Sequence, residues 1–193
     1  MGLLDIIRGQ RPPKRADLDR LFAISTAHLT LTVNLELVPA GRAGVCFKPV
    51  EAGAFAELMR DLDQLLELAE TSSGTSVVRH ADEMGFDWVV LEDEDFEDLV
   101  TTTHLVNQTI EERGFSERLL CSVFPFRSAG GAPVDLVYAY KRGTFYPFAP
   151  IDGKRRDNAL ELRLQGALSR EMPMEPELER WYPLWDAPVT AGS

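Results

Sequence analysis

The stretch from Tyr140 to Leu162 holds the densest group of residues that could bind a ligand. An aromatic and proline run, GTFYPFAP, lies between a pair of basic residues and a group of three, and a helix is expected to begin directly after them. A helix start offers free backbone N–H groups, and basic side chains beside it can hold a phosphate or a carboxylate. One hypothesis is therefore a small-ligand or anion site, compatible with an enzyme, within residues 141–156. Its candidate residues are Arg142, Lys154, Arg155 and Arg156.

The aromatic residues of this stretch have two further interpretations. They can fill the space where a sheet passes the chain to its last helix, or they can contact a partner protein, because aromatic residues are common in both places. The partner-binding candidates are Phe145, Tyr146 and Phe148, together with Trp181 and Trp185 near the C-terminus. The residues alone leave these alternatives open.

Other familiar chemistry finds little support in the sequence. The three histidines lack the spacing of metal ligands, and neither cysteine is near one of them. The acidic run from Glu92 to Asp98 lacks the alternation of a calcium loop and falls where a helix is expected to begin, where negative charge is favourable. No nucleophile elbow, phosphate-binding glycine loop or dinucleotide fingerprint is present. We therefore predict no catalytic residue, no metal and no cofactor, although a triad assembled from distant residues stays open.

Composition and charge narrow the class of protein. A chain of 193 residues with 45% hydrophobic residues can bury a substantial core. The formal net charge of -11 argues against a nucleic-acid partner. Cys46 and Cys121 sit in apolar strand-like runs, which predicts buried free thiols in a reducing compartment, with a disulfide as the alternative. Without a secretory signal or an apolar run long enough to span a bilayer, we expect a cytoplasmic protein.

The hydrophobic periodicity predicts an α+β fold in which the order strand, strand, helix occurs three times. Residues 16–170 form this domain, preceded by an amphipathic segment and linker at 1–15 that could lie on a membrane. The expected strands are 29–38, 45–50, 75–81, 86–92, 118–126 and 134–143, and the expected helices are 53–70, 95–113 and one from about 157. Hairpins predict antiparallel pairing, and the amphipathic helices predict a covered sheet face. Whether there is one sheet or two stays open.

Two details concern the C-terminal third. Asn158 followed three residues later by Glu161 predicts a capping box at the last helix. Residues 171–193 are rich in proline and tryptophan, and a disordered tail rarely carries so many large aromatics. We expect this segment to pack on the body and to be loose only at its end.

The chain resembles the PspA-associated protein family PspAB. The resemblance rests on MGLLD, DLDRLFAIS, GVCFKPVEAGAF, LLCSVFPF, YKRGTFYPFAP, RRDNALEL and ERWYPLW, which occur in order along nearly the whole sequence. It implies an accessory protein of a phage-shock type of envelope-stress response, in which PspA is a coiled-coil peripheral membrane protein. It implies no enzymatic activity and carries over no catalytic residue.

Two hypotheses follow. The leading one is a non-enzymatic accessory protein that acts by protein–protein interaction with PspA near the cytoplasmic face of the membrane. The alternative is the small-ligand or anion-binding protein described above. A homodimer resembling a secretion chaperone is a third arrangement that the order of elements permits.

Overall fold

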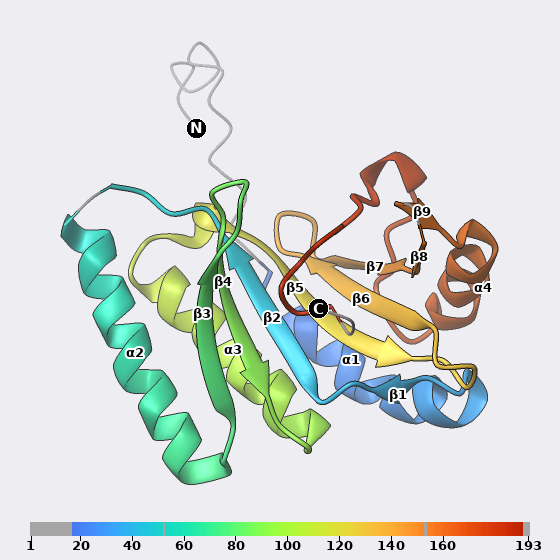
Figure 1. Ribbon diagram of the computed structural model, residues 1–193, viewed down its shortest axis with the longest axis horizontal. Coiled ribbons are helices and arrows are strands. Elements are labelled where there is room, and N and C mark those ends of the chain that lie inside the picture. Colours follow the sequence, from blue (N-terminus) through green and yellow to red (C-terminus); the bar gives the residue numbers. More distant parts are fainter. Residues whose placement is uncertain (1–16, 52, 153, 191–193) are drawn as a thin grey trace, which may run out of the picture.

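One antiparallel sheet organises the molecule (Figure 1). The computed structural model describes residues 17–51, 53–152 and 154–190. The sheet has seven strands in the order β3-β4-β2-β5-β6-β7, and β1 pairs with β5. The strands are β1 (Val38–Pro39), β2 (Arg42–Phe47), β3 (Ser76–Ala81), β4 (Asp87–Glu92), β5 (Leu119–Arg127), β6 (Pro133–Ala139) and β7 (Thr144–Phe148). The α+β prediction is confirmed, and the hairpins join a single sheet.

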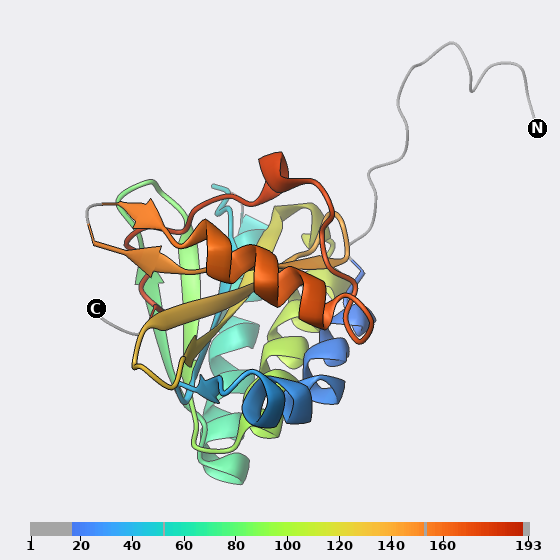
Figure 2. The same ribbon diagram turned by 90° about the vertical axis from the view of Figure 1, so that its right-hand side faces the viewer.

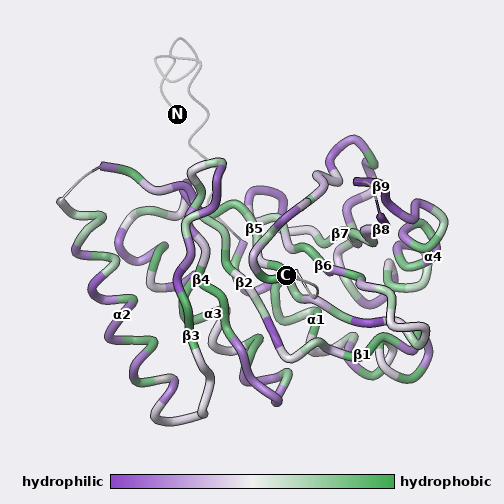
Figure 3. Tube along the Cα trace, in the orientation of Figure 1, coloured by the Kyte–Doolittle hydropathy of each residue, from purple (hydrophilic) through white to green (hydrophobic). Residues whose placement is uncertain are grey.

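Eight helical segments accompany the sheet within the described ranges. They are η1 (Asp19–Phe22), α1 (Ala23–Thr26), η2 (Thr30–Asn34), α2 (Gly53–Ser73), α3 (Phe96–Glu112), η3 (Ser116–Arg118), α4 (Asn158–Leu168) and η4 (Leu178–Arg180). The predicted helices at 53–70 and 95–113 are confirmed as α2 and α3. Figure 3 shows hydrophobic and hydrophilic residues alternating along α2, as in a helix that turns one apolar face to a core. Asp95 caps α3 by accepting hydrogen bonds from the backbone of Glu97 and Asp98, as the acidic run predicts.

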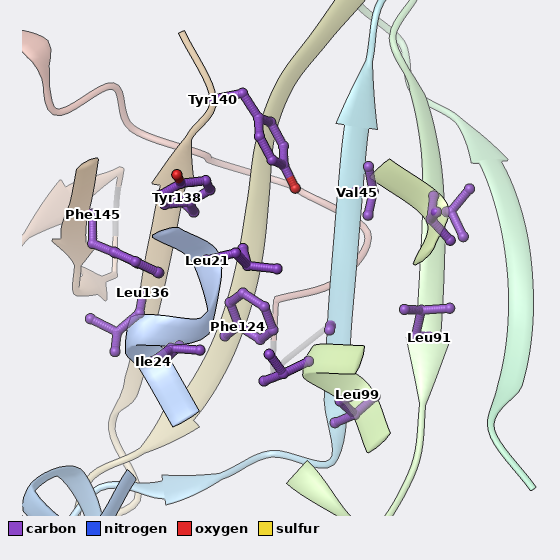
Figure 4. Close-up of a cluster of buried hydrophobic side chains, with 14 of the residues drawn as sticks. Leu21, Ile24, Val45, Leu91, Leu99, Phe124, Leu136, Tyr138, Tyr140 and Phe145 are labelled. Carbon is purple, nitrogen blue, oxygen red and sulfur yellow. The ribbon is translucent and has the colours of Figure 1, made fainter. Parts of the chain in front are cut away.

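The sheet carries buried apolar residues on both faces, because successive side chains of a strand point to opposite sides. On one face, residues such as Val45, Leu91, Phe124, Leu136 and Tyr138 pack against the helices (Figure 4). The other face presents a second cluster that includes Cys46, Trp88, Val90, Cys121, Val123, Val137, Tyr146 and Phe148. Both faces therefore need a cover.

The C-terminal segment covers the second face. It passes in front of the sheet in Figure 1, while α1 and α3 lie behind. Trp181, Ala187 and Val189 are buried in the second cluster. At Gly44 the approach is so close that a Cβ atom there would lie 2.9 Å from the Val189 Cβ. The C-terminal segment therefore packs directly against the backbone of β2, where Gly44 has no side chain.

The β7 edge of the sheet is also covered. The Phe145 N–H donates to the Pro173 carbonyl at 2.8 Å, and the Glu175 N–H donates to the Phe145 carbonyl at 2.7 Å. Helix α4 packs beside β7, at the end of the sheet nearest the viewer in Figure 2. A small separate ribbon of β8 (Pro150–Ile151) and β9 (Arg155–Arg156) precedes this helix. Chain capping an edge strand prevents that edge from pairing with other molecules.

The predicted strand at 29–38 is wrong. Residues 30–34 form a π-helical turn, and only Val38 of this stretch is in a strand, the two-residue β1 that it forms with Pro39. A buried helical row that begins earlier overrides the apolar alternation. It comprises the fully buried Leu21, Ile24, Ala27 and Leu31. Spacings of three and four residues place these side chains on one side of a helix, against α3. The first of the three predicted strand–strand–helix units therefore lacks the long first strand that the sequence predicted.

Two further expectations fail near the end of the sheet. TFYPF is not a crossing loop but strand β7, which pairs with β6. The capping box is also wrong, because the cap of α4 is Asp157, whose Oδ1 accepts from the Leu160 N–H at 2.9 Å. Glu161 instead turns inward to the Ala149 N–H and Arg156. A buried cation attracts this carboxylate more strongly than an exposed backbone amide.

Two statements bear on membranes. No helix in the described ranges is long and apolar enough to cross a membrane. The predicted amphipathic segment at 1–15 lies outside the described residues.

Asp135 is the one carboxylate of the second face that is fully buried in strand β6. Neither of its oxygens has a hydrogen-bond partner within the described chain. Burial raises its pKa to about 7, because desolvation disfavours the charged form. Asp135 is thus a proton-binding group of the folded state.

We predict that Asp135 makes folding stability fall as the pH rises. Between pH ~4 and ~7 the folded state holds a proton that the unfolded state has released, so the free energy of unfolding decreases through this range, by up to about 4 kcal/mol, and levels off above it. Urea denaturation at a series of pH values, compared with Asp135→Asn, isolates the effect. The same pH dependence in both proteins would contradict it.

Candidate functional site

The four candidate anion-binding residues do not converge on one point. Arg155 is exposed and donates from Nε to the Asp152 carbonyl at 3.1 Å. Lys154 is also exposed and pairs with Asp186 at 3.2 Å. Arg142 lies in the turn that precedes β7, 3.9 Å from Glu175, and Arg156 points toward the buried Glu161. The structure therefore separates the basic cluster of the sequence into three places.

Arg156 is part of the interior. Its Nε donates to Glu161 Oε1 at 2.9 Å, and its Nη1 donates to the Trp181 carbonyl at 2.9 Å. The guanidinium also lies 5.2 Å from the centre of the Phe148 ring. This one side chain connects α4, β7 and the C-terminal segment, and its charge is already neutralised by a buried carboxylate. Arg156 has little left to offer an external anion.

The aromatic candidates lie together but mostly inside. Phe145, Tyr146 and Phe148 are buried in β7, and Trp181 is buried against them. The Tyr146 and Trp181 rings stack with centroids 6.4 Å apart, and the Phe148 and Trp185 rings meet edge-on at 4.9 Å. Only Trp185 is partly exposed. In this conformation the other four rings stabilise the fold and cannot contact a partner directly.

Glu175 organises a second basic cluster that the sequence analysis missed. Its buried carboxylate accepts from Thr144 Oγ1 at 3.1 Å and lies 3.5 Å from Arg180 Nη1 and 3.9 Å from Arg142 Nη1. Lys141 belongs to the same turn as Arg142 and has no ion pair in the described part of the chain. Lys141, Arg142 and Arg180 line an open polar groove of about 460 Å³.

The same three cations stand at the mouth of an apolar cavity of about 480 Å³. The cavity lies between the second face of the sheet and the C-terminal segment. Its lining comes from six separate parts of the chain, including Cys46, Phe86, Trp88, Cys121, Tyr146 and Leu184. No sequence motif could reveal such a site, because its residues meet only when the C-terminal segment crosses the sheet.

The polar atoms inside this cavity are satisfied by the protein itself. Trp88 Nε1 donates to Asp82 Oδ2 at 3.0 Å, and the Tyr146 hydroxyl donates to the Tyr182 carbonyl at 3.0 Å. Cys46 and Cys121 are direct partners across β2 and β5, and both are buried free thiols, as predicted. A hydrogen bond with Cys121 and desolvation raise the pKa of Cys46, so its thiol is neutral.

Asp82, in the turn between β3 and β4, lies across the sheet from the cations that follow β6, because Trp88, Cys46, Cys121 and Ala139 are successive partners from β4 to β6. Its Oδ1 accepts the backbone N–H groups of Met84 and Phe86, each at 2.9 Å. Burial alone would raise the pKa of Asp82, but these hydrogen bonds and the one from Trp88 outweigh it and lower the pKa. The carboxylate is therefore ionised at neutral pH. The cavity is apolar within, positive at one end and negative at the other.

A different surface exposes apolar side chains along the first helical segment. Phe22, Leu29 and Val33 are 39%, 71% and 64% exposed. Leu29 follows Phe22 by seven residues and Val33 follows Leu29 by four, with exposed Thr26 between the first two. The spacings of four, three and four residues match those of a coiled-coil seam, on a segment that passes from a 3-10 turn (η1) through α-helix (α1) to a π-helical turn (η2). We call these four residues the helical stripe.

The helical stripe is held in place by α3. The Phe22 ring lies 4.7 Å from the His104 ring, and the His28 ring lies 4.7 Å from Phe96. These two contacts show that the segment runs antiparallel to α3. Two of the three histidines, His28 and His104, therefore pack against aromatic rings. Groups of three or more metal-ligating side chains are absent from the described residues.

We predict that Arg156 acts in stability. Arg156→Ala would leave the Glu161 carboxylate buried without its cation, and breaking a buried pair in this way costs about 3–5 kcal/mol of unfolding free energy. Arg155→Ala, its exposed neighbour, should change that free energy by no more than about 0.5 kcal/mol. Urea denaturation followed by tryptophan fluorescence measures both. Equal stability of the two variants would show that Arg156 is not needed for the fold.

Comparison with known proteins assigns nearly the whole chain to one family. The family model described as PspAB, PspA associated protein B, matches residues 1–189. No curated protein and no solved structure matches the chain. The family predicted from the sequence is thereby confirmed, and its description names an association with PspA. The chain belongs to the PspAB family.

Proposed function

We propose that this protein is a non-enzymatic accessory protein of a PspA system and acts by protein–protein interaction. The observation that carries the proposal is the family match over residues 1–189. The positions of Arg156 and of the buried aromatic residues agree with it, because these side chains, which could have formed a catalytic loop, hold β7, α4 and the C-terminal segment together.

The proposed contact surface is the helical stripe. Large apolar side chains that are exposed together commonly mark interaction sites. A stripe with coiled-coil spacing suits a partner that presents a helix with an apolar seam of its own. A coiled-coil PspA, as the family resemblance implies, would offer such a helix. This surface replaces the aromatic candidates of β7, whose rings are buried.

The charges around the helical stripe favour a partner with basic flanks. Asp19 and Glu36 border the stripe in the sequence and are exposed, while the exposed Arg20 beside Asp19 is paired with Asp17 at 2.9 Å. Glu97 stands in the first turn of α3, next to Phe96, which touches His28. A second copy of this chain would bring the same carboxylates to the interface and be repelled. We therefore favour PspA over self-association, and we place the protein at the cytoplasmic membrane face only through PspA.

We predict that Leu29→Asp and Val33→Asp each weaken binding to the PspA of the same genome by about tenfold or more, since each places a charge in an apolar contact. Isothermal titration calorimetry with the two purified full-length proteins measures the affinity.

Leu68→Asp on α2 is the matched control, because Leu68 is 68% exposed and lies on another helix. It should bind PspA as the wild type does. The contact surface is wrong if all three variants bind alike. The function itself is wrong if the wild-type protein shows no affinity for PspA, and a dimer in light scattering that Leu29→Asp dissociates would favour self-association instead.

A further inference from the structure

The apolar cavity between the sheet and the C-terminal segment has the features of a ligand site. Its volume of about 480 Å³ falls within the range of small-molecule pockets, roughly 300–1,000 Å³. It is lined mainly by rings, thiols and aliphatic side chains. The PspA contact proposed above uses neither this cavity nor its rim, so the cavity needs an explanation of its own.

The interior of the cavity would accept only an apolar body. The polar atoms of Trp88 and Tyr146 are already bonded to Asp82 and to the Tyr182 carbonyl. The two thiols face each other across the strand pair, and Cys46, whose pKa is raised, stays protonated. A polar ligand body would lose its hydrogen bonds to water and find no free donor among these groups, whereas an apolar body would lose nothing.

The rim adds a requirement for negative charge at one end. Lys141, Arg142 and Arg180 line both the apolar cavity and the polar groove beside it, so they stand where the two meet. Glu175 and Glu177 neutralise part of the two arginines, and Lys141 forms no ion pair within the described residues. The ionised Asp82 at the other end would repel an anion. A ligand with an anionic head is therefore held in one orientation.

A neighbouring cavity of about 540 Å³ shows why the position is selective. It shares Asp82, Met84, Trp88, Pro183 and Leu184 with the first. It adds the acidic Glu83 and Asp186, and its Lys154 is paired to Asp186. Its rim is acidic and unsuited to an anion. On a protein of net charge -11, the basic rim of the first cavity is a local exception.

We infer that the cavity binds a single-chain amphiphile, with its apolar chain on Trp88, Cys46 and Cys121 and its carboxylate or phosphate head on Lys141, Arg142 and Arg180. Neither head nor chain would suffice alone. The head gains charge-assisted hydrogen bonds, and the chain gains apolar burial of roughly 25 cal/mol per Å².

The test is calorimetric titration of the full chain with dodecanoate, dodecyl phosphate, dodecanol and inorganic phosphate, each below its aggregation limit. Both charged amphiphiles should bind one per chain and about tenfold more tightly than dodecanol, the effect of one charge-assisted hydrogen bond. Inorganic phosphate should give no measurable binding. Flotation with anionic-lipid vesicles forms a separate arm that distinguishes a free amphiphile from a bilayer surface.

Variants separate the head from the chain. Lys141→Glu, at an exposed turn residue, should weaken dodecanoate binding about tenfold and leave dodecanol unchanged. Lys154→Glu makes the same charge change at the neighbouring cavity and should alter neither. Ala139→Phe fills the pocket from its wall and should abolish binding of both ligands. Circular dichroism verifies that each variant is folded, and Lys141→Glu decides the matter if Ala139→Phe is not.

Four results would overturn the inference. They are equal affinity for dodecanoate and dodecanol, binding of inorganic phosphate without dodecanoate, equal effects of Lys141→Glu and Lys154→Glu, and capture on anionic vesicles without any binding of the monomeric amphiphiles.

Discussion

A sheet that is apolar on both faces imposes the main constraint on this molecule. Helices α1, α2 and α3 can cover one face, but the side chains of Trp88, Val123 and Phe148 on the other would be left in water. The C-terminal segment covers them, because Trp181 and Val189 enter the second cluster. Arg156 and Glu175 then tie this segment to α4 and β7. The cavity, its basic rim and the burial of the aromatic candidates all follow from that cover.

Local pattern predicted much of the fold. Three features that depend on neighbouring residues were predicted correctly. They are the amphipathic helices α2 and α3, the hairpin of β3 and β4, and the acidic cap at Asp95. The strand predicted at 29–38 is wrong because the buried helical row that begins at Leu21 overrides the alternation of apolar and polar residues. Strand β7 was taken for a loop because its aromatic and proline content resembles a crossing, whereas pairing with β6 decides its conformation.

The candidate site could be predicted only in part. Of the four cations proposed from the sequence, Arg142 lines the groove together with Lys141 and Arg180, whereas Lys154, Arg155 and Arg156 lie elsewhere. Arg180 lies far from Arg142 in the sequence, and the path of the C-terminal segment brings it beside Arg142. No spacing rule predicts such a path. The family match supports association with PspA, while the helical stripe and the cavity would allow the protein to serve one partner and one ligand separately.

The central claim is that the C-terminal segment is packed on the second face of the sheet at Gly44. A double-mutant cycle with Gly44→Ala and Val189→Gly tests it most directly, since a Cβ at position 44 would lie 2.9 Å from the Val189 Cβ. Urea denaturation should show that Gly44→Ala costs about 1–3 kcal/mol alone and at least about 1 kcal/mol less when Val189 is glycine. Additive effects of the two substitutions, within about 0.5 kcal/mol, would contradict the account.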